Sequence, residues 1–137
     1  MQLSVYTDGG SRGNPGPSGF GVAIYDHQKN LIAQISKFIG IKTNNEAEYT
    51  ALIDALVWIN NHQSELDINS VDIFSDSQLL VRQQQGRYKV KSPHIVSLNN
   101  LVKALINATT ITYKFHEIPR ELNVLADQLA NQAMDHR

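Results

Sequence analysis

The sequence predicts an α/β fold with one mixed five-stranded sheet, and three observations lead to this prediction. Apolar residues alternate with a period of two in three consecutive segments before residue 42. From residue 43 the period becomes helical, and two more strand-like segments separate the later helices, which gives the order βββαβααβα. A length of 137 residues and a hydrophobic content of 42% suit a single domain, residues 1–137, with one core.

The three strand-like segments at the start are separated by turn signals. Leu3–Thr7 alternates and is expected to end at Asp8, and residues 11–17 contain two glycines and two prolines, which predicts a loop. Gly19–Tyr25 and Leu31–Ile41 predict two further strands around a turn. Because short connections join antiparallel neighbours, these three strands are expected to form a meander.

The first helix has a clear start signal. Thr43 and Glu46 fit a capping box, in which the Thr43 hydroxyl accepts from a free backbone amide and Glu46 reaches back. A helix of about four turns is expected to follow and to end near residues 60–61. The later segments predict a strand at Val71–Ser75, a short helix at Ser77–Gln84, a helix at Pro93–Asn107, a strand around residues 111–116 and a final helix at Leu122–Met134.

Composition narrows the classes of function. The net charge of −1 argues against a protein that coats nucleic acid through a strong overall positive field. One segment without acids contains Arg82, Arg87, Lys89 and Lys91, and such a run is most simply a solvated face. Since there is no cysteine, a metal must be held by oxygen or imidazole ligands. No apolar run approaches the ~18 residues of a membrane span, so we expect a soluble, cytoplasmic protein.

Four acidic residues stand out as candidate site residues. Asp8 and Asp76 each follow a strand, so both carboxylates lie at one edge of the sheet if these strands are parallel neighbours. Glu48 is more informative because it falls on the apolar stripe of its helix, where an unpaired carboxylate is costly. Asp127, beside the apolar side of the last helix, is expected to reach the same crevice.

Several carboxylates at one place need a compensating charge. They raise one another's pKa unless a divalent cation lies between them. Oxygen-only ligands favour Mg²⁺, with Mn²⁺ as the alternative. Two such ions roughly 4 Å apart position a water for in-line attack on a phosphodiester and stabilise the leaving oxygen. The four acids therefore predict a metal-dependent phosphodiester hydrolase.

Four segments resemble the signature blocks of type 1 ribonuclease H, in the family's order and approximate spacing. They are residues 6–16, 43–48, 75–78 and 123–130. The resemblance implies the ribonuclease H fold with helices on both faces of the sheet, and two Mg²⁺ ions. It also implies an endonuclease that cuts the RNA strand of RNA/DNA hybrids and leaves 5′-phosphate and 3′-hydroxyl ends.

The resemblance also implies roles for individual residues. Asp8, Glu48, Asp76 and Asp127 match the family's catalytic, metal-binding acids. Amide side chains bond base edges and the 2′-hydroxyl that distinguishes RNA from DNA, which suits the amides that match minor-groove contacts. The implied substrate-binding residues are Asn14, Asn45 and Gln78 in the minor groove, Thr43 and Asn44 on the DNA strand, and Arg120 and Asn123 in the closing region.

In two departures from the best-known members, the chain resembles a compact bacterial and archaeal branch of that family. Residues 86–93 leave no room for the extra basic helix and loop with which many members hold their substrate. Arg120 stands where many members have a histidine that helps the product leave.

The sequence leaves open two alternatives to a hybrid-specific endonuclease. One is a non-catalytic module that binds RNA/DNA hybrids, and the other is a nuclease of broader choice that also cuts double-stranded RNA or DNA junctions. The four acids argue against a pure binder, since negative charge facing phosphate weakens binding unless a metal is present. Without a long heptad seam, a monomer is expected.

Overall fold

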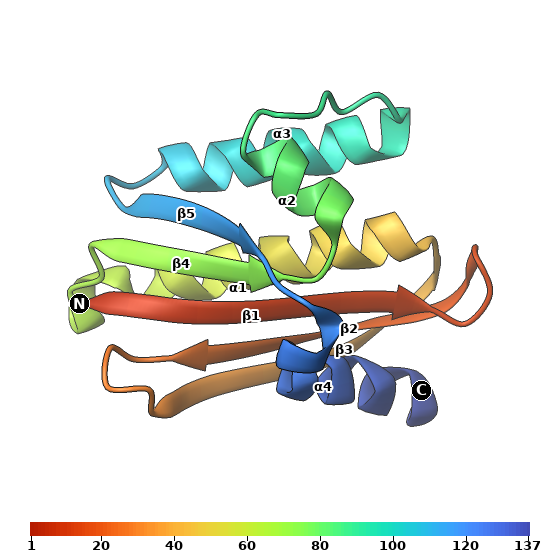
Figure 1. Cartoon of the computed structure of the whole chain (residues 1–137), viewed down its shortest axis with the longest axis horizontal. Coiled ribbons are helices and arrows are strands. Elements are labelled where there is room, and N and C mark those ends of the chain that lie inside the picture. Colours follow the sequence, from red (N-terminus) through yellow and green to blue (C-terminus); the bar gives the residue numbers. More distant parts are fainter.

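A five-stranded mixed sheet forms the centre of the protein, and the computed structural model describes residues 1–137. Its strand order is β3-β2-β1-β4-β5 (Figure 1). The predicted meander is confirmed because β2 pairs antiparallel with β1 and β3, while β1, β4 and β5 are parallel. The strands are β1 (Gln2–Ser11), β2 (Gly16–Tyr25), β3 (Leu31–Lys42), β4 (Ser70–Ser75) and β5 (Thr112–Glu117).

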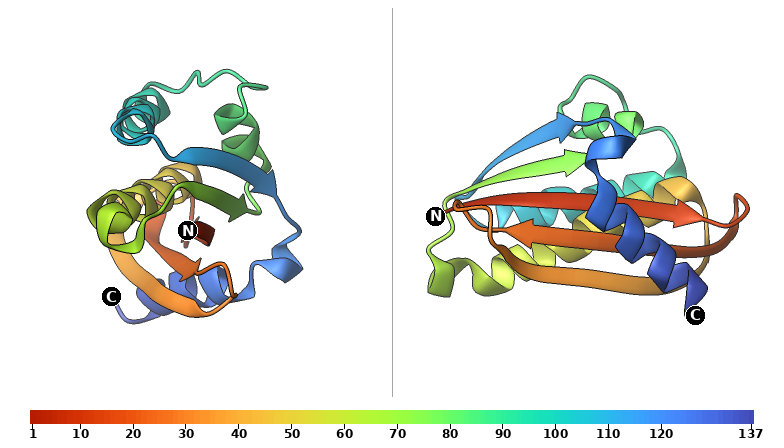
Figure 2. Two further views of the ribbon diagram at one scale, coloured as in Figure 1. Left: turned by 90° about the vertical axis from the view of Figure 1, so that its left-hand side faces the viewer. Right: turned by 60° about the horizontal axis from the view of Figure 1, so that its bottom comes forward.

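Helices cover both faces of the sheet, as expected (Figure 2). Long α1 (Asn44–Leu66) and α3 (Pro93–Asn107) pack together on one face, and α4 (Val124–Asp135) crosses β2 on the other. Short α2 (Gln78–Gln84) follows β4, and a 3₁₀ turn at Arg120–Leu122 precedes α4. None of these helices combines the length and the apolar character needed to cross a membrane.

The core lies between the sheet and α1. Alternate residues of β1, Leu3 and Val5, are fully buried against the apolar stripe of α1, which includes Leu52 and Leu56. On the other face, α4 lies so close to β2 that a Cβ on Gly21 would fall 2.3 Å from the carbonyl oxygen of Ala126. Glycine in β2 therefore sets the distance between the sheet and α4.

Helix α1 begins as predicted and ends later than predicted. The Thr43 hydroxyl accepts from the Glu46 amide, and the Glu46 carboxylate accepts from the Thr43 amide, so the capping box is confirmed. The helix continues beyond residues 60–61 to Leu66, where Asp67 adopts a left-handed backbone conformation that ends it, and α3 packs along it. The Asn60 side chain donates to the carbonyl of Leu105 in α3 at 3.0 Å, a contact that local sequence does not reveal.

The expected loop at residues 11–17 is wrong in its bounds. Asp8 does not end β1, which continues to Ser11, and β2 already begins at Gly16. Ser11 is the last residue of β1 to pair with β2, and only residues 12–15 lie outside both strands. Gly9, which lies inside this longer β1, serves close packing: a Cβ on Gly9 would fall 2.4 Å from the carbonyl carbon of Ala47 in α1.

Candidate functional site

Three of the four predicted acids meet at the end of the parallel strand pair β1–β4. Thr7 and Ser75 are the last paired residues of that ladder, and Asp8 and Asp76 follow them directly. One carboxylate oxygen from each of Asp8, Asp76 and Glu48 lies within 4.8 Å of the others. We call these three residues the acid cluster.

Glu48 reaches the cluster because α1 packs unusually close to β1. The missing side chain of Gly9 lets the first turns of α1 touch the strand. The Gly9 amide donates to Glu48 Oε1 at 2.6 Å, and this bond fixes the carboxylate beside Asp8. Glu48 is only 9% exposed, so its charge has little contact with water.

Burial and mutual repulsion disfavour the charged forms of two of these acids. Burial, followed by the charge of Asp76 and a hydrogen bond with Asp127, raises the pKa of Asp8 to about 8. Burial and the charges of Asp8 and Asp76 raise the pKa of Glu48 well above its ordinary value. A divalent cation between them would reverse this effect by favouring the carboxylates.

Asp127 lies at the rim of the same cavity. Its carboxylate approaches the Arg120 guanidinium, with Asp127 Oδ1 3.7 Å from Arg120 Nη2. Both residues line a cavity of about 360 Å³ that also contains the acid cluster. The fourth acid is therefore adjacent to the cluster, but it is already paired with a cation.

Asn123 is buried beneath the segment that leads into α4. Its side chain is 1% exposed, and its amide donates to the Thr7 carbonyl at 2.9 Å and to Asp76 Oδ1 at 3.4 Å. These two bonds fasten residues 120–124 across β1. In this structure Asn123 contacts a carboxylate of the acid cluster and is not part of an open surface.

The predicted amides join the β1–β2 hairpin to the start of α1. Asn14 Oδ1 accepts from the Asn44 amide at 3.0 Å, and Asn44 Oδ1 accepts from the Ser11 amide at 2.9 Å. A second cavity of about 380 Å³ lies beside these residues. Its lining is Asn14, Thr43, Asn44, Asn45, Glu46, Ser92, His94 and Ile95.

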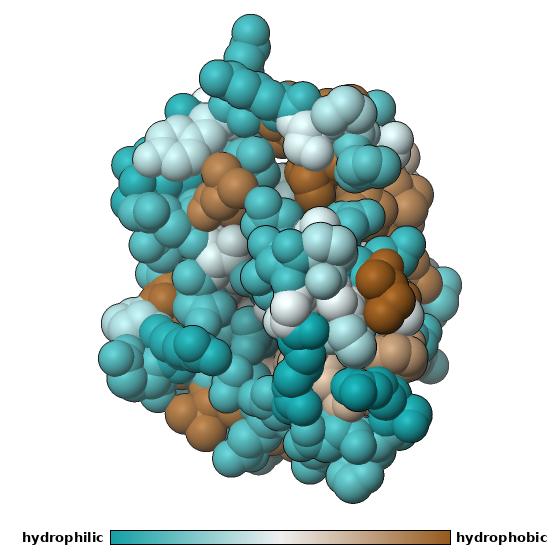
Figure 3. Space-filling model, turned by 90° about the vertical axis from the view of Figure 1, so that its right-hand side faces the viewer, coloured by the Kyte–Doolittle hydropathy of each residue, from teal (hydrophilic) through white to brown (hydrophobic).

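Asn44 and Asn45 line both this second cavity and the acid cavity, so the two adjoin. Gln78 begins α2 two residues after Asp76 and lines neither of them. The end of the molecule that bears the hairpin and the C-terminus is mainly hydrophilic, with a few separate apolar residues (Figure 3).

Comparison with known proteins places these features in a family. A family model described as "Reverse transcriptase-like" matches residues 6–133. The crystal structure of LC11-RNase H1 in complex with an RNA/DNA hybrid superposes with a TM-score of 0.93 at 42% identity. The superposition covers 98% of this chain and 97% of that one. This chain belongs to the ribonuclease H-like family.

Other relatives agree in fold and differ in length. RNase H1 of the archaeon Halobacterium salinarum superposes with a TM-score of 0.89 at 31% identity, and each chain is covered completely. A protein of Mycobacterium tuberculosis named as bifunctional is 40% identical over 138 residues, which is 98% of this chain. This chain spans 36% of the length of that relative, so the match concerns one part of a longer protein.

The residues without a predicted role that line the acid cavity of this ribonuclease H-like chain include Arg12, Asn131 and Met134. Asn131 follows Asp127 by one helical turn, so the spacing of four residues was the signal that would have identified it. Arg12 gave no such signal, because its partner Asp135 lies at the other end of the sequence.

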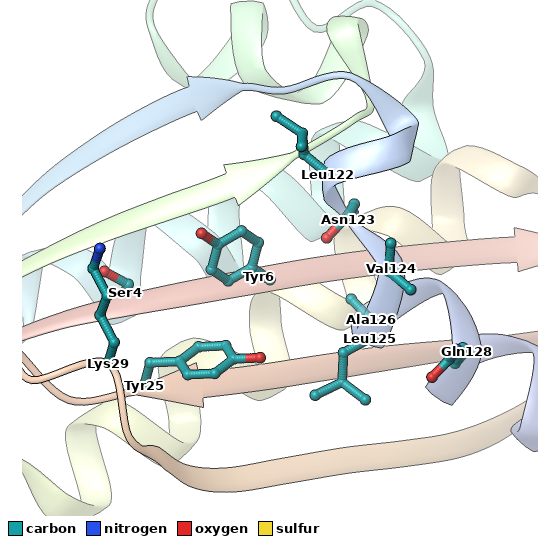
Figure 4. A pocket seen from close by; sticks show the side chains of 10 residues that line it. All are labelled: Ser4, Tyr6, Tyr25, Lys29, Leu122, Asn123, Val124, Leu125, Ala126 and Gln128. Carbon is teal, nitrogen blue, oxygen red and sulfur yellow. The ribbon is translucent and has the colours of Figure 1, made fainter.

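The largest cavity lies elsewhere and contains none of the four acids. It has a volume of about 460 Å³ and lies between the sheet and the residues that enter α4 (Figure 4). Tyr6, Tyr25, Leu122 and Val124 supply most of its apolar wall, with Lys29 at one end. In this ribonuclease H-like fold, the residues suited to chemistry on phosphate are thus in the smaller, polar cavity.

Proposed function

We propose that this chain is an endonuclease that hydrolyses the RNA strand of RNA/DNA hybrids in a metal-dependent reaction. The main support is the acid cluster, whose three carboxylate oxygens lie within 4.8 Å of one another at the end of two parallel strands. The similarity to LC11-RNase H1, which was crystallised with an RNA/DNA hybrid, supports the choice of substrate.

The residues of the acid cavity fit two divalent cations. Its four acids and its asparagines offer oxygen donors, which suit Mg²⁺, with Mn²⁺ as the alternative. Asp8, Glu48, Asp76 and Asp127 would hold the ions. When bound, such ions activate a water molecule and neutralise charge that develops on the phosphate. They would also offset the burial and the mutual repulsion that raise the pKa values of Asp8 and Glu48.

The chain's own residues orient the substrate. Amide groups of Asn14, Asn45 and Gln78 bond base edges and the 2′-hydroxyl in the minor groove, which selects RNA for the cut strand. Thr43 and Asn44, beside the second cavity, bind the DNA strand. Hydrolysis adds water across the bond between phosphorus and the 3′-oxygen, so the products end in 5′-phosphate and 3′-hydroxyl.

Arg120 takes the place of the loop histidine in the compact branch that we propose for this chain. Its side chain is 78% exposed and pairs loosely with Asp127, so it can follow a departing phosphate. Asn123 acts within the site through its bond to Asp76. We propose that residues 1–137 act as one monomeric ribonuclease H domain that binds its hybrid without a basic handle.

A substrate panel tests this function. Purified protein with Mg²⁺ or Mn²⁺ is incubated with a labelled RNA/DNA hybrid, double-stranded RNA and a four-way DNA junction. We expect cleavage of the hybrid's RNA alone, with 5′-phosphate ends, and no cleavage by folded Asp8→Asn. Binding without cleavage in both ions would identify a non-catalytic module instead, and equal cleavage of double-stranded RNA would identify a broader nuclease.

A further inference from the structure

Arg12 lines the acid cavity, but its ion pair is with a residue outside the acid cluster. It lies in the short hairpin loop after β1, and its side chain is 44% exposed. Arg120 pairs with Asp127, one of the four acids. Arg12 instead pairs with Asp135, which is not one of the four acids.

Helix α4 holds the Arg12 guanidinium in place. Arg12 Nη1 lies 2.6 Å from Asp135 Oδ1, and Nη2 donates to Asn131 Oδ1 at 3.3 Å. Asn131 and Asp135 are one turn apart, so both present their side chains on the same side of α4. A guanidinium has five N–H donors, and these two contacts leave others free toward the cavity.

The position of Arg12 indicates which strand of the proposed substrate it can contact. The strand that is cut must pass through the acid cavity, whereas Asn14 and Thr43 line the second cavity. Arg12 lines the acid cavity and not the second one, although Asn14 is only two residues away. The hairpin therefore presents Asn14 toward α1 and Arg12 toward α4.

We propose that Arg12 binds a backbone phosphate of the RNA strand next to the one that is cut, an inference that rests on the proposed function. Arginine suits this contact because its planar donors match phosphate oxygens and its charge is permanent. The contact is independent of base sequence and fixes the register of the RNA strand over the acid cluster. Arg12 thus partly replaces the missing basic handle.

Steady-state cleavage by the whole chain tests the contact. Arg12→Ala should raise KM about tenfold with little change in kcat. It should also reduce the slope of log K for hybrid binding against log salt concentration by about one. Arg12→Lys should restore most of the salt dependence because it keeps the charge. Lys29→Ala, which removes a cation far from the acid cavity, should change neither quantity.

Asp135→Asn separates a phosphate contact from a merely structural one. This variant breaks the same ion pair but leaves the cation, so we expect a KM that is unchanged or lower. A KM that rises as much as in Arg12→Ala would show that the pair only anchors the hairpin, and would overturn the inference.

A second experiment locates the contact on the substrate. A set of hybrids has one RNA phosphate at a time replaced by an uncharged methylphosphonate. The wild type should bind the hybrid more weakly when one particular phosphate beside the cut is replaced. The affinity of Arg12→Ala should not change with the same replacement. Equal losses in both proteins at every position would contradict the inference alone, whereas a wild type that cuts no hybrid would overturn the proposed function as well.

Discussion

The face of the sheet that α4 covers has two halves of opposite character, one aromatic and one acidic, and residues 120–124 separate them. Tyr6 and Asp8 are two residues apart in β1, so both point to this face. Tyr6 lies in the aromatic half, where it stacks on Phe74 with ring centroids 4.7 Å apart, and Phe74 stacks on His116 at 4.8 Å. Asp8 lies in the acid half, where burial and neighbouring carboxylates raise its pKa.

We infer from this difference that the aromatic half serves stability and that the acid half serves the proposed function. In the aromatic half each ring has a neighbour, and Asp72 is bonded by His116 Nε2 at 2.7 Å. In the acid half, burial and the neighbouring carboxylates raise the pKa values of both Asp8 and Glu48. A site that destabilises its own fold is typical of a binding or catalytic centre.

The largest effect should come from replacing an acid in the acid half, compared with replacing one in the aromatic half. We expect Asp8→Asn to lower hybrid cleavage by at least about 100-fold, as is typical when one strong electrostatic contact to the transition state is lost. Asp72→Asn, the matched control in the aromatic half, should keep activity near that of the wild type. Comparable losses in both variants would show that the acid half has no special role.

Metal binding should stabilise only a protein with an intact acid half. Adding Mg²⁺ at 100 times its Kd should stabilise wild type by about 2.7 kcal/mol, because the ion binds the folded state alone. Asp8→Asn should gain much less, and Asp72→Asn should gain as much as wild type. Thermal melts with EDTA and with increasing Mg²⁺ measure this difference; identical gains in all three proteins would contradict the account.

Without metal, the acid half should weaken the fold as pH rises. The folded pKa of Asp8 is about 8 against an ordinary value of 3.8, so the penalty is absent below about pH 4 and complete above about pH 8. The melting temperature of Asp8→Asn should therefore exceed that of wild type increasingly across this range, by roughly 3–5 °C per 1 kcal/mol relieved. A constant difference from pH 4 to 8 would contradict the assigned cause.

The smallest effect should come from the aromatic half. His116→Ala removes the stack on Phe74 and the bond to Asp72, so we expect a loss of about 1 kcal/mol of unfolding free energy. Its kcat on hybrids should stay unchanged, because His116 lines neither the acid cavity nor the second cavity. Urea unfolding and steady-state kinetics measure the two quantities separately, and a lower kcat would show that the halves are coupled.

Features that depend on neighbouring residues were predictable from the sequence. The Thr43–Glu46 capping box and the place of Glu48 on the apolar stripe of α1 follow from local spacing. Features that depend on distant contacts were not. The packing of α1 against α3 includes the hydrogen bond from Asn60 to Leu105, and the pairing of Arg12 with Asp135 joins the two ends of the chain.

The glycines show a further limit of sequence-based prediction. Gly9 and Gly10 follow a strand pattern and resemble a turn, yet Gly9 pairs with Phe20 and Gly10 with Gly19 inside the β1–β2 ladder. The lack of a side chain at Gly9 serves the close approach of α1, which a local pattern does not describe. The acid cluster was predictable because its residues combine strand ends, a buried charge and a family pattern.

The central claim is that the acid half is a site for divalent cations, and anomalous diffraction from crystals grown with Mn²⁺ tests it most directly. We predict an anomalous peak bounded by the carboxylates of Asp8, Glu48 and Asp76, and none in the aromatic half. A well-ordered crystal with Mn²⁺ bound only elsewhere, and the three carboxylates still in contact, would contradict the account.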